Sequence, residues 1–391
     1  MAMNHLCFAD DLLMFCRGDL NSVKLMLEGF KVFSEATGLQ VNPTKSSIYC
    51  CGMSSSIQTS IQQCSGFKLD FLPFRYLGVP ISSKKLKASD CDLLVEKMVA
   101  KIKVWSSRHI SFAGRMQLVN SVLMSICVYW GQIFLLPKRI TQKITAICRS
   151  FLWFGTYDES RPGSVGWDQL CNHKDQGGLG FRNISLWNQA AVGKLAWAIS
   201  ENSITEALAS TQWLTDPKYS IKNIYGGLCT QQPKVHWHRF VWNRFSVPKH
   251  RFTLWLALLD RLKTRVRLFK IGVGDDPSCA ICGSVVETCS HLFFECTFST
   301  DCLQLVLNWL GYTVTKTNLT QVFMWVRRYC KKEFRRKVIF TALAGLVYQI
   351  WKARNDVVWN HNVPTKQFIL KTIQFDTRHR IQNLLGKTVR L

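Results

Sequence analysis

Apolar residues recur along much of the chain at the three- and four-residue spacing of an amphipathic helix. This spacing predicts helices over residues 21–37, 89–107, 114–136 and 141–154. Gly38 follows the first of them, where a residue in the left-handed conformation commonly ends a helix. The pattern therefore predicts a mostly helical chain.

Three shorter apolar runs are typical of strands. Residues 6–15 are apolar except for Asp10 and Asp11, which predicts a buried pair of strands with two acidic residues at its turn. Residues 45–49 predict a short strand, and residues 74–81 predict a hairpin punctuated by glycine and proline. We therefore expect an α+β fold that is mostly helical.

The acidic pair indicates metal chemistry. Buried carboxylates cost free energy unless their charge is compensated, and a divalent cation is the usual partner. Such carboxylates can hold two Mg²⁺ ions on the order of 4 Å apart, but the centre needs at least one further carboxylate from a neighbouring strand. Only nine residues precede Asp10, so we expect no such partner upstream of it in this chain.

A second metal signal lies far downstream. Three cysteines and one histidine follow the pattern Cys-x2-Cys-x8-His-x4-Cys at Cys279, Cys282, His291 and Cys296. Three thiolates and one imidazole make a complete tetrahedral set for structural Zn²⁺, with no open position for catalysis. The alternative is a decayed copy whose site stays empty, and Cys289 is a spare thiol that could compete with the histidine.

The other cysteines and the apolar stretches bear on the compartment. The chain has 16 cysteines and no secretory signal, which favours a reducing, intracellular location over a disulfide framework. Residues 118–136 are long enough to raise the question of a membrane span, but polar residues interrupt them, which favours a buried helix. Residues 338–351 are too short to span. We expect no signal peptide, no transmembrane segment and no membrane partner.

Charge is unevenly distributed along the chain. The net charge is +25, yet residues 276–302 carry four acidic and no basic residues. Residues 234–275 carry 10 basic and 2 acidic residues, and residues 303–391 carry 16 and 3. The flanks of the zinc segment, rather than the segment itself, are therefore the expected contacts for a phosphate backbone, although a solvated basic surface is the plainer alternative.

Three basic regions are candidates for that contact. Residues 101–150 hold eight basic residues and no acidic one, which suits a helical surface that grips a duplex. Residues 236–273 interleave aromatics with arginines, which suits either stacking on bases or a helical core. Residues 331–337 suit an RNA contact, a nuclear-import signal or the solvated face of a helix. The candidate residues are Lys101, Lys103, Arg108, Arg115, Arg261, Arg265, Arg267, Lys331, Lys332, Arg335 and Arg336.

Several motifs in order resemble the reverse transcriptase of plant LINE-type non-LTR retrotransposons. The turn Phe8-Ala9-Asp10-Asp11 resembles the catalytic turn of that family, and Tyr76-Leu77-Gly78-Val79-Pro80 is similar to its primer-grip hairpin. Residues 113–123 and 151–155 resemble the thumb, and residues 219–302 resemble the reverse-transcriptase zinc-binding domain.

The resemblance implies a domain order. It implies a partial palm over 1–82, a helical thumb over 83–155, a connector over 156–218, a zinc-binding domain over 219–302 and a basic helical tail over 303–391. It implies an RNA-directed DNA polymerase whose partner is RNA or a DNA/RNA duplex, with Asp10 and Asp11 as catalytic Mg²⁺ ligands, and a nuclear location. Mg²⁺ is expected only if the polymerase is complete.

The chain also departs from the family. The fingers and the strand that bears the first catalytic aspartate belong before the acidic turn, and we expect them to be missing, so independent polymerase activity is not expected. A ribonuclease H domain needs about four clustered carboxylates, whereas residues 303–391 contain Glu333, Asp356 and Asp376 alone. The segment Trp351-Lys352-Ala353-Arg354-Asn355 resembles a tail segment of related plant proteins, with no known chemistry.

Three functions follow from these observations. The favoured one is a nucleic-acid-binding remnant of a retrotransposon polymerase that keeps the acidic turn and the zinc module. The second is an active reverse transcriptase completed by a missing N-terminal half. The third is a zinc-stapled protein-interaction module without a nucleic-acid role.

Overall fold

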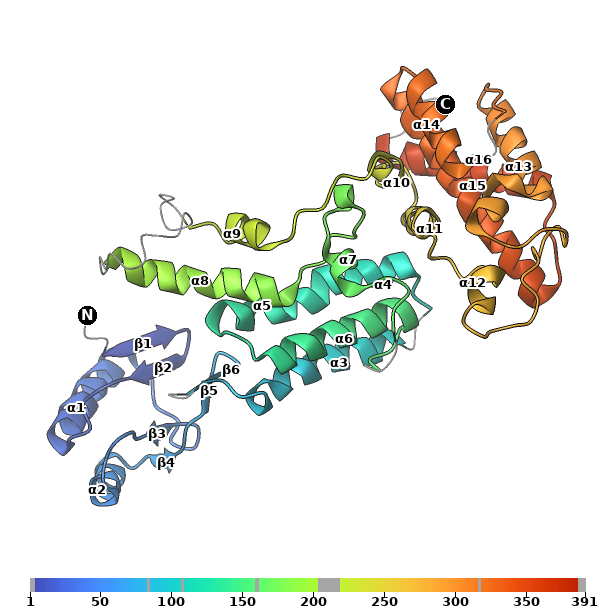
Figure 1. Ribbon diagram of the computed structural model, residues 1–391. Helices are drawn as coiled ribbons and strands as arrows, with labels where there is room; N and C mark the ends of the chain where they lie inside the picture. The colour runs from blue at the N-terminus through green and yellow to red at the C-terminus, as the bar shows by residue number, and fades with distance from the viewer. Residues whose placement is uncertain are drawn as a thin grey trace. The chain divides into compact units, whose positions relative to one another are not determined.

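The structure is a computed structural model in which two compact units are defined (Figure 1). The units are Met1–Asp90 and Cys91–Leu391, and each is described by itself. The chain is mostly helical with few strands, as the sequence predicts. The described residues are 4–82, 85–106, 109–158, 162–202, 219–315 and 318–385.

The first unit begins with a strand pair and a helix. Strands β1 (His5–Phe8) and β2 (Asp11–Met14) pair antiparallel, with Phe8 opposite Asp11. Helix α1 (Leu20–Thr37) begins after Asp19, whose carboxylate accepts a hydrogen bond from the Ser22 amide at 2.8 Å. It ends at Gly38 with φ of 71°, as predicted.

The rest of the first unit consists of two further strand pairs. Strand β3 (Ser47–Tyr49) pairs parallel with β4 (Lys68–Asp70), and α2 (Ser55–Ser65) connects them. Strands β5 (Phe74–Tyr76) and β6 (Val79–Ile81) form the predicted hairpin. Leu77 and Gly78 have φ of 50° and 80°, the left-handed conformation at both central positions that a tight two-residue hairpin requires.

This unit has a thin core, and one prediction about it is wrong. Its buried aliphatic side chains, among the residues described, are Val23, Ile61 and Val79. Strand β1 is exposed throughout, and Phe8 is 60% exposed, so β1 and β2 are not the buried pair that the apolar run predicts. The reason is that β1 hydrogen-bonds only to β2, and a two-stranded pair cannot bury its own faces.

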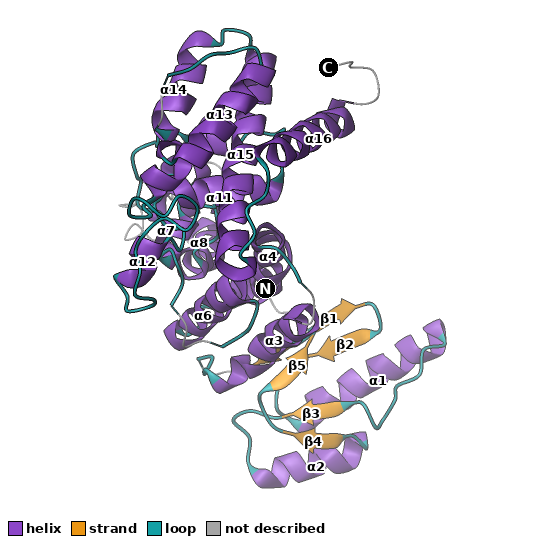
Figure 2. Cartoon of the chain, turned by 90° about the vertical axis from the view of Figure 1, so that its right-hand side faces the viewer, coloured by secondary structure: helices purple, strands orange, loops and turns teal. Residues whose placement is uncertain are grey.

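The second unit begins with a helical layer, drawn in purple in Figure 2. The predicted helix over 89–107 is a short turn, η1 (Ser89–Cys91), which starts in the first unit, followed by α3 (Asp92–Ser106). The predicted helix over 114–136 is α4 (Phe112–Leu118), a π-helical turn, η2 (Val119–Leu123), and α5 (Met124–Ile133). The remaining elements are α6 (Lys138–Phe154), α7 (Trp167–Cys171), η3 (Lys174–Gln176) and α8 (Ile184–Asn202).

The core of this layer contains the residues that the helical spacing selects. Leu94, Met98 and Ile102 of α3 are fully buried, as are Ile144 and Phe151 of α6 to within one percent. The segment over 118–136 packs in this layer, in agreement with the buried-helix interpretation. Over the part of the chain that the structure describes, no helix is apolar and long enough to cross a membrane.

Further helices of the second unit surround α15 (Glu333–Asn360). Helix α15 packs against α10, α11, α13, α14 and α16, and the Phe240 ring stacks on Phe323 and contacts Phe340. The remaining elements of the unit are α9 (Ile221–Leu228), which packs against α8 instead, and α10 (His238–Val241), α11 (Pro248–Leu258), α12 (Arg265–Phe269), η5 (His291–Glu295), α13 (Thr297–Trp309), α14 (Leu319–Tyr329) and α16 (Lys366–Leu385).

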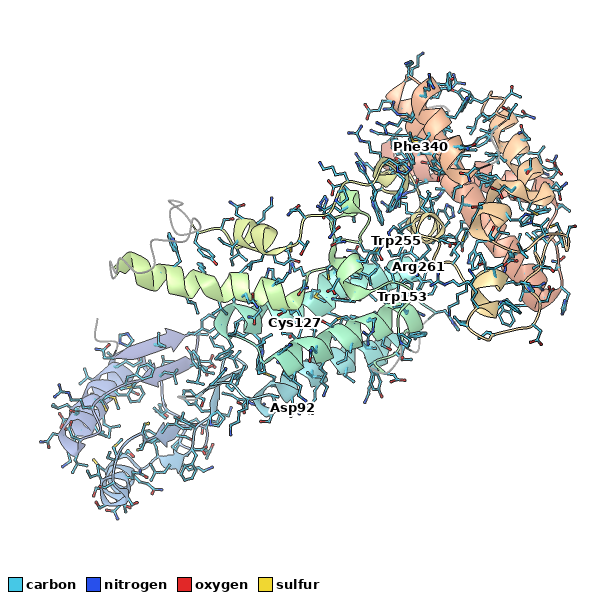
Figure 3. The ribbon with its side chains drawn as sticks, in the orientation of Figure 1. Asp92, Cys127, Trp153, Trp255, Arg261 and Phe340 are labelled. Carbon is cyan, nitrogen blue, oxygen red and sulfur yellow. The ribbon has the colours of Figure 1, made fainter. Side chains whose placement is uncertain are left out.

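Aromatic side chains join α11 to the first helical layer. Phe252 stacks on Phe112 of α4 at 5.4 Å between ring centroids, and it contacts Trp153 of α6 at 6.1 Å and Trp255 at 5.4 Å. Figure 3 labels Trp153 and Trp255 at this junction. Most aromatics of residues 236–273, among them Phe252 and Trp255, are therefore core residues, whereas Trp242 is half-buried and Phe269 is 50% exposed.

Candidate metal centre and basic surfaces

The four predicted zinc ligands come together in the second unit. The ligand atoms of Cys279, Cys282, His291 and Cys296 all lie within 4.8 Å of one another. The Cys282 Sγ lies 3.3 Å from the His291 Nε2. Bond lengths of about 2.3 Å to sulfur and 2.0 Å to nitrogen put tetrahedral ligand atoms roughly 3.5–3.8 Å apart, so the cluster fits a Zn²⁺ ion with small adjustments.

The first two ligands lie on a tight knuckle turn. The Cys279 amide donates to the Val285 carbonyl at 2.7 Å, and the Gly283 amide donates back to the Cys279 carbonyl at 2.8 Å. Gly283 has φ of 68°, the left-handed conformation that lets the chain reverse directly after the second cysteine. Because backbone hydrogen bonds hold the turn, both thiols face the same side.

The second two ligands lie on another tight turn, η5. The Cys296 amide donates to the His291 carbonyl at 2.7 Å, which closes the loop between the two ligands. Phe293 and Phe294 leave helical geometry within this turn, and both are completely buried. Their burial anchors the turn in the core, so the imidazole and the thiol are brought back to the knuckle by packing.

The thiols interact with one another in the cluster. A hydrogen bond between Cys279 and Cys296 raises the pKa of the Cys279 thiol and lowers the pKa of the Cys296 thiol. The site therefore favours ionisation at one sulfur before the other, which is the first step toward the thiolates that Zn²⁺ requires.

The spare thiols lie outside the cluster. Cys289 hydrogen-bonds to Asp260, and its burial raises the pKa of its thiol. Burial likewise raises the pKa of Cys302 to about 12. Neither thiol belongs to the group of four side chains whose ligand atoms gather in the cluster, so the structure gives no support to competition between Cys289 and His291.

A buried ion pair lies behind the knuckle. The Glu287 carboxylate has no exposed surface, and its Oε1 accepts a hydrogen bond from the Arg354 Nε at 2.9 Å and forms an ion pair with the Arg354 Nη2 at 2.9 Å. The same carboxylate accepts from the Arg265 amide at 2.8 Å and from the Ala280 amide at 3.1 Å. The spacing of the cysteines and the histidine did not identify Glu287 as a residue of the metal site. Its position, as an acidic residue in an apolar segment between the two ligand pairs, was the signal that could have identified it.

The predicted catalytic pair has a different environment. Ala9 and Asp10 form the two-residue turn of the β1–β2 hairpin, and Ala9 has φ of 51°. Asp10 and Asp11 are both exposed. Over the residues described, the zinc cluster is the one group of three or more potential metal-ligating side chains, and neither aspartate belongs to it. The expectation that the pair needs a metal to offset burial is therefore wrong.

Two predicted nucleic-acid contacts instead hold the structure next to the zinc cluster. Arg265 pairs with Asp276 at 2.9 Å and donates to the Ser278 carbonyl at 3.1 Å. Arg267 donates to the Asp260 carbonyl at 2.8 Å. Arg261 is half-buried, and Figure 3 labels it. These bonds occupy part of each guanidinium, so the arginines of this segment stabilise loops as well as add positive charge.

The candidates of the first helical layer are of two kinds. Lys101 and Lys103 of α3 are exposed. Arg115 is half-buried with its guanidinium 5.4 Å from the Phe112 ring centroid, and burial lowers its pKa without removing its charge. Arg108 lies outside the described residues. The exposed lysines are therefore the better candidates for phosphate contacts.

The candidates of the tail lie beside an apolar groove. Lys331, Lys332 and Arg335 are exposed at the start of α15, and Arg336 is half-buried. The Arg335 guanidinium lies 4.9 Å from the Tyr312 ring centroid and donates to the Leu310 carbonyl at 3.2 Å. A groove of about 370 Å³ lies here, lined by Trp309, Leu310, Phe334, Arg335, Val338, Ile339, Thr377 and Arg378.

Comparison with known proteins supports the metal centre. Residues 219–302 match the family described as zinc-binding in reverse transcriptase. The chain is 30% identical over 121 residues to an Arabidopsis thaliana protein named "Putative ribonuclease H protein", which covers 31% of this chain and 20% of that protein. It is 35% identical over 77 residues to an Arabidopsis thaliana "Uncharacterized mitochondrial protein", which covers 19% of this chain and 50% of that protein.

The chain thus spans half or less of the length of these curated relatives. The predicted resemblance is confirmed at the level that the matches support. Residues 219–302 are similar to the zinc-binding region of reverse transcriptases.

Proposed function

We propose that the chain is a zinc-stapled nucleic-acid-binding protein of the reverse-transcriptase group, with RNA or a DNA/RNA duplex as its partner. The observation that carries this proposal is the charge pattern around the metal centre. An acidic segment with no basic residue lies between two segments in which basic residues exceed acidic ones by 8 and 13.

Zinc acts structurally in this proposal. Cys279, Cys282, His291 and Cys296 would hold the ion, and four protein ligands leave no position for a substrate. Bound zinc supplies folding free energy to the knuckle and to the turn that brings back the second ligand pair. The four zinc ligands therefore have a structural role: they hold two loops together and keep the basic flanking segments in place.

The tail groove supports recognition of single strands. Its apolar lining includes Trp309 and Phe334, and its cationic lining includes Arg335 and Arg378. An unpaired base stacks on an aromatic ring while its phosphate meets a guanidinium, whereas a duplex presents only phosphates to such a surface. Two carboxylates adjoin lining residues along the chain: Glu333 is paired with Lys337 at 2.6 Å, and Asp376 lies 3.7 Å from the His250 imidazole.

Salt dependence tests the proposal directly. Fluorescence anisotropy with labelled single-stranded RNA should show tight binding at 50 mM salt and a loss of roughly 300-fold by 200 mM, if about six phosphates are contacted. The double variant Lys331→Ala/Lys332→Ala should flatten the logarithmic salt slope by about 1.4, since each phosphate contact on a single strand contributes about 0.7. Lys24→Ala/Lys31→Ala, with the same charge change on exposed α1 positions, should leave the slope unchanged.

The rival interaction module makes the opposite prediction. It would bind neither single-stranded RNA nor a DNA/RNA duplex above the background of a neutral protein at any salt concentration. Equal weakening by the two double variants would mean that only the overall positive charge matters, and the tail would lose its assigned role.

Polymerisation by this chain is not part of the proposal. A two-metal centre needs a third carboxylate, and the described residues gather none at Asp10 and Asp11. We expect no primer extension on an RNA template by the purified chain. Extension that is lost in Asp10→Ala would instead show that the chain is an active polymerase, with its metal centre completed by other carboxylates of this chain or of a second polypeptide.

Ribonuclease H activity is also not favoured. The tail acids are Glu333, Asp356 and Asp376. Glu333 pairs with Lys337, and Asp376 lies 3.7 Å from the His250 imidazole. Within the described part of the chain these acids do not join a metal-binding group, so the name of one relative supplies no activity here.

A further inference from the structure

The tail helix α15 contributes a side chain to the surroundings of the metal centre. Arg354 lies 67 residues after Glu287 in the chain, is 4% exposed, and forms a hydrogen bond and an ion pair with the Glu287 carboxylate. It belongs to the tail segment Trp351-Lys352-Ala353-Arg354-Asn355, to which the sequence assigned no chemistry. We propose that Arg354 is a positioning residue of the zinc centre, acting through Glu287.

Glu287 is bonded to the knuckle that carries the first two ligands. Its Oε2 accepts from the amide of Ala280, which lies in the knuckle between Cys279 and Cys282. Its own amide donates to the Pro277 carbonyl at 2.8 Å, just before the knuckle, and His291 follows four residues later in the chain. The carboxylate therefore holds the knuckle against the segment from which the second ligand pair continues.

Arg354 keeps that carboxylate in place. A fully buried carboxylate without a cation would be expelled or neutralised, since an uncompensated buried charge is strongly unfavourable. Residues 276–302 contain no basic residue, so the compensating cation must come from another part of the chain. Arg265 contributes only its amide to Glu287, because its guanidinium pairs with Asp276. Arg354 is thus the cation that Glu287 contacts.

The charge of the metal centre strengthens the need for this arginine. Three thiolates and a neutral imidazole around Zn²⁺ carry a net charge of −1, and the Glu287 carboxylate adds another negative charge beside them. Carboxylates and cations around metal ligands set ligand orientation, and their loss typically weakens metal binding by about 10- to 100-fold. Arg354 also contacts the Trp351 ring at 5.2 Å and donates to the Asn355 Oδ1 at 3.1 Å, which fixes the guanidinium.

The test uses the full chain and measures zinc affinity by competition with a chromophoric chelator, with Co²⁺ absorption spectra as a geometric readout. The inference rests on the proposed zinc binding, so the unmodified chain is measured first. One equivalent of tightly bound zinc is expected. A well-folded chain that binds less than half an equivalent would overturn zinc binding itself and this inference with it.

The variants then separate positioning from stability. Arg354→Met should weaken zinc binding by about 10- to 100-fold and shift the Co²⁺ spectrum, and Arg354→Lys should restore part of the affinity. Ile350→Ala removes a fully buried apolar side chain from the same helix but no charge or hydrogen bond of the Glu287–Arg354 pair, so it should lower the melting temperature yet keep zinc affinity within about threefold.

A double variant checks that Arg354 acts through Glu287. Glu287→Gln/Arg354→Met should bind zinc no more weakly than the worse single variant, because each change removes the same interaction. Additive losses would overturn the proposal. Unchanged zinc affinity in folded Arg354→Met would also overturn it, whatever happens to its melting temperature. If Arg354→Met does not fold, Arg354→Lys and Glu287→Gln decide the matter by the same criteria.

Discussion

The two units contain metal-ligand candidates of opposite character. In Met1–Asp90 the acidic pair lies on an exposed hairpin turn, in a unit whose described buried aliphatic residues are Val23, Ile61 and Val79. In Cys91–Leu391 three of the four zinc ligands are buried, and two completely buried phenylalanines anchor the turn between the last two. The acidic pair is thus held by a single hairpin, and the zinc ligands are held by a packed core.

A metal site can be predicted from one sequence when local turns bring all its ligands together. The zinc ligands occupy 18 consecutive positions from Cys279 to Cys296, so local turns suffice to gather them. A two-metal carboxylate centre must assemble from separate strands of a wider sheet, and the first unit has only two-stranded pairs. One short segment therefore supplies all the zinc ligands, whereas the acidic pair depends on further carboxylates that the strands of the first unit do not supply.

Removal of a zinc ligand should have the largest effect. Cys282→Ala should abolish tight zinc binding and unfold the surrounding loops, because zinc contributes on the order of 10 kcal/mol to comparable peptides. Cys289→Ala is the matched control, since this thiol lies in the same segment but bonds to Asp260. Zinc content by atomic emission and thermal melting check the outcome, and equal loss in both variants would contradict the assignment.

Amide hydrogen exchange should separate the two units next. We expect fast exchange over residues 4–82, because few buried side chains protect the backbone there, and slow exchange over α3, α6 and α11. Mass spectrometry of peptides from the exchanged chain measures this difference. Uniform protection would show that the first unit has a core as stable as the second, and the comparison would fail.

The sequence predicted helices and local metal ligands well because both depend on short spacings. The helix that ends at Gly38, the buried face of α3 and the four zinc ligands were all readable from neighbouring residues. The core role of Trp255 and Phe252 was also among the alternatives, since their spacing is helical.

Long-range packing set the limit of prediction. The apolar run around Asp10 predicted burial, but burial depends on whether another layer covers the strands, which no local pattern states. The bond between Glu287 and Arg354 joins positions 67 residues apart, and neither residue type reveals its partner. Arg265 and Arg267 were predicted to contact nucleic acid from their charge and the aromatics around them, which could not reveal the hydrogen bonds that both also make within the fold.

Acid should weaken the second unit through His250. This imidazole is 2% exposed, stacks on Tyr348 and lies beside Lys249, with the Asp376 carboxylate 3.7 Å away and beyond hydrogen-bond distance. Burial, with a smaller contribution from Lys249, lowers its pKa from 6.5 to about 3. Between pH 6.5 and about pH 3, His250 is therefore protonated in the unfolded chain but neutral in the folded chain. The free energy of unfolding consequently falls as pH decreases below 6.5.

The expected loss at pH 5 is about 2 kcal/mol relative to neutral pH, from roughly 1.4 kcal/mol for each pKa unit. Urea unfolding at saturating zinc should show this slope in the unmodified chain and a smaller one in His250→Gln. His379→Gln changes an exposed histidine and should leave the slope as it is. A slope unchanged in His250→Gln would place the acid sensitivity elsewhere, with the zinc thiolates as the first alternative.

The acidic pair should give the smallest effect, and it offers the sharpest check of the comparison. Asp10→Asn and Asp11→Asn should each change unfolding free energy by less than about 0.5 kcal/mol, because both side chains are exposed.

Asp275 and Asp276 form a second exposed pair of adjacent aspartates in the same chain. If Asp10 and Asp11 lack a third carboxylate, Mn²⁺ should broaden the NMR signals of both pairs to a similar, weak degree. Stoichiometric binding of two ions at Asp10 and Asp11, abolished by Asp10→Asn and absent at Asp275 and Asp276, would mean that another acid of this polypeptide reaches the turn. The first unit would then hold a reaction centre, and its thin core would have to be explained as a state that metal and nucleic acid complete.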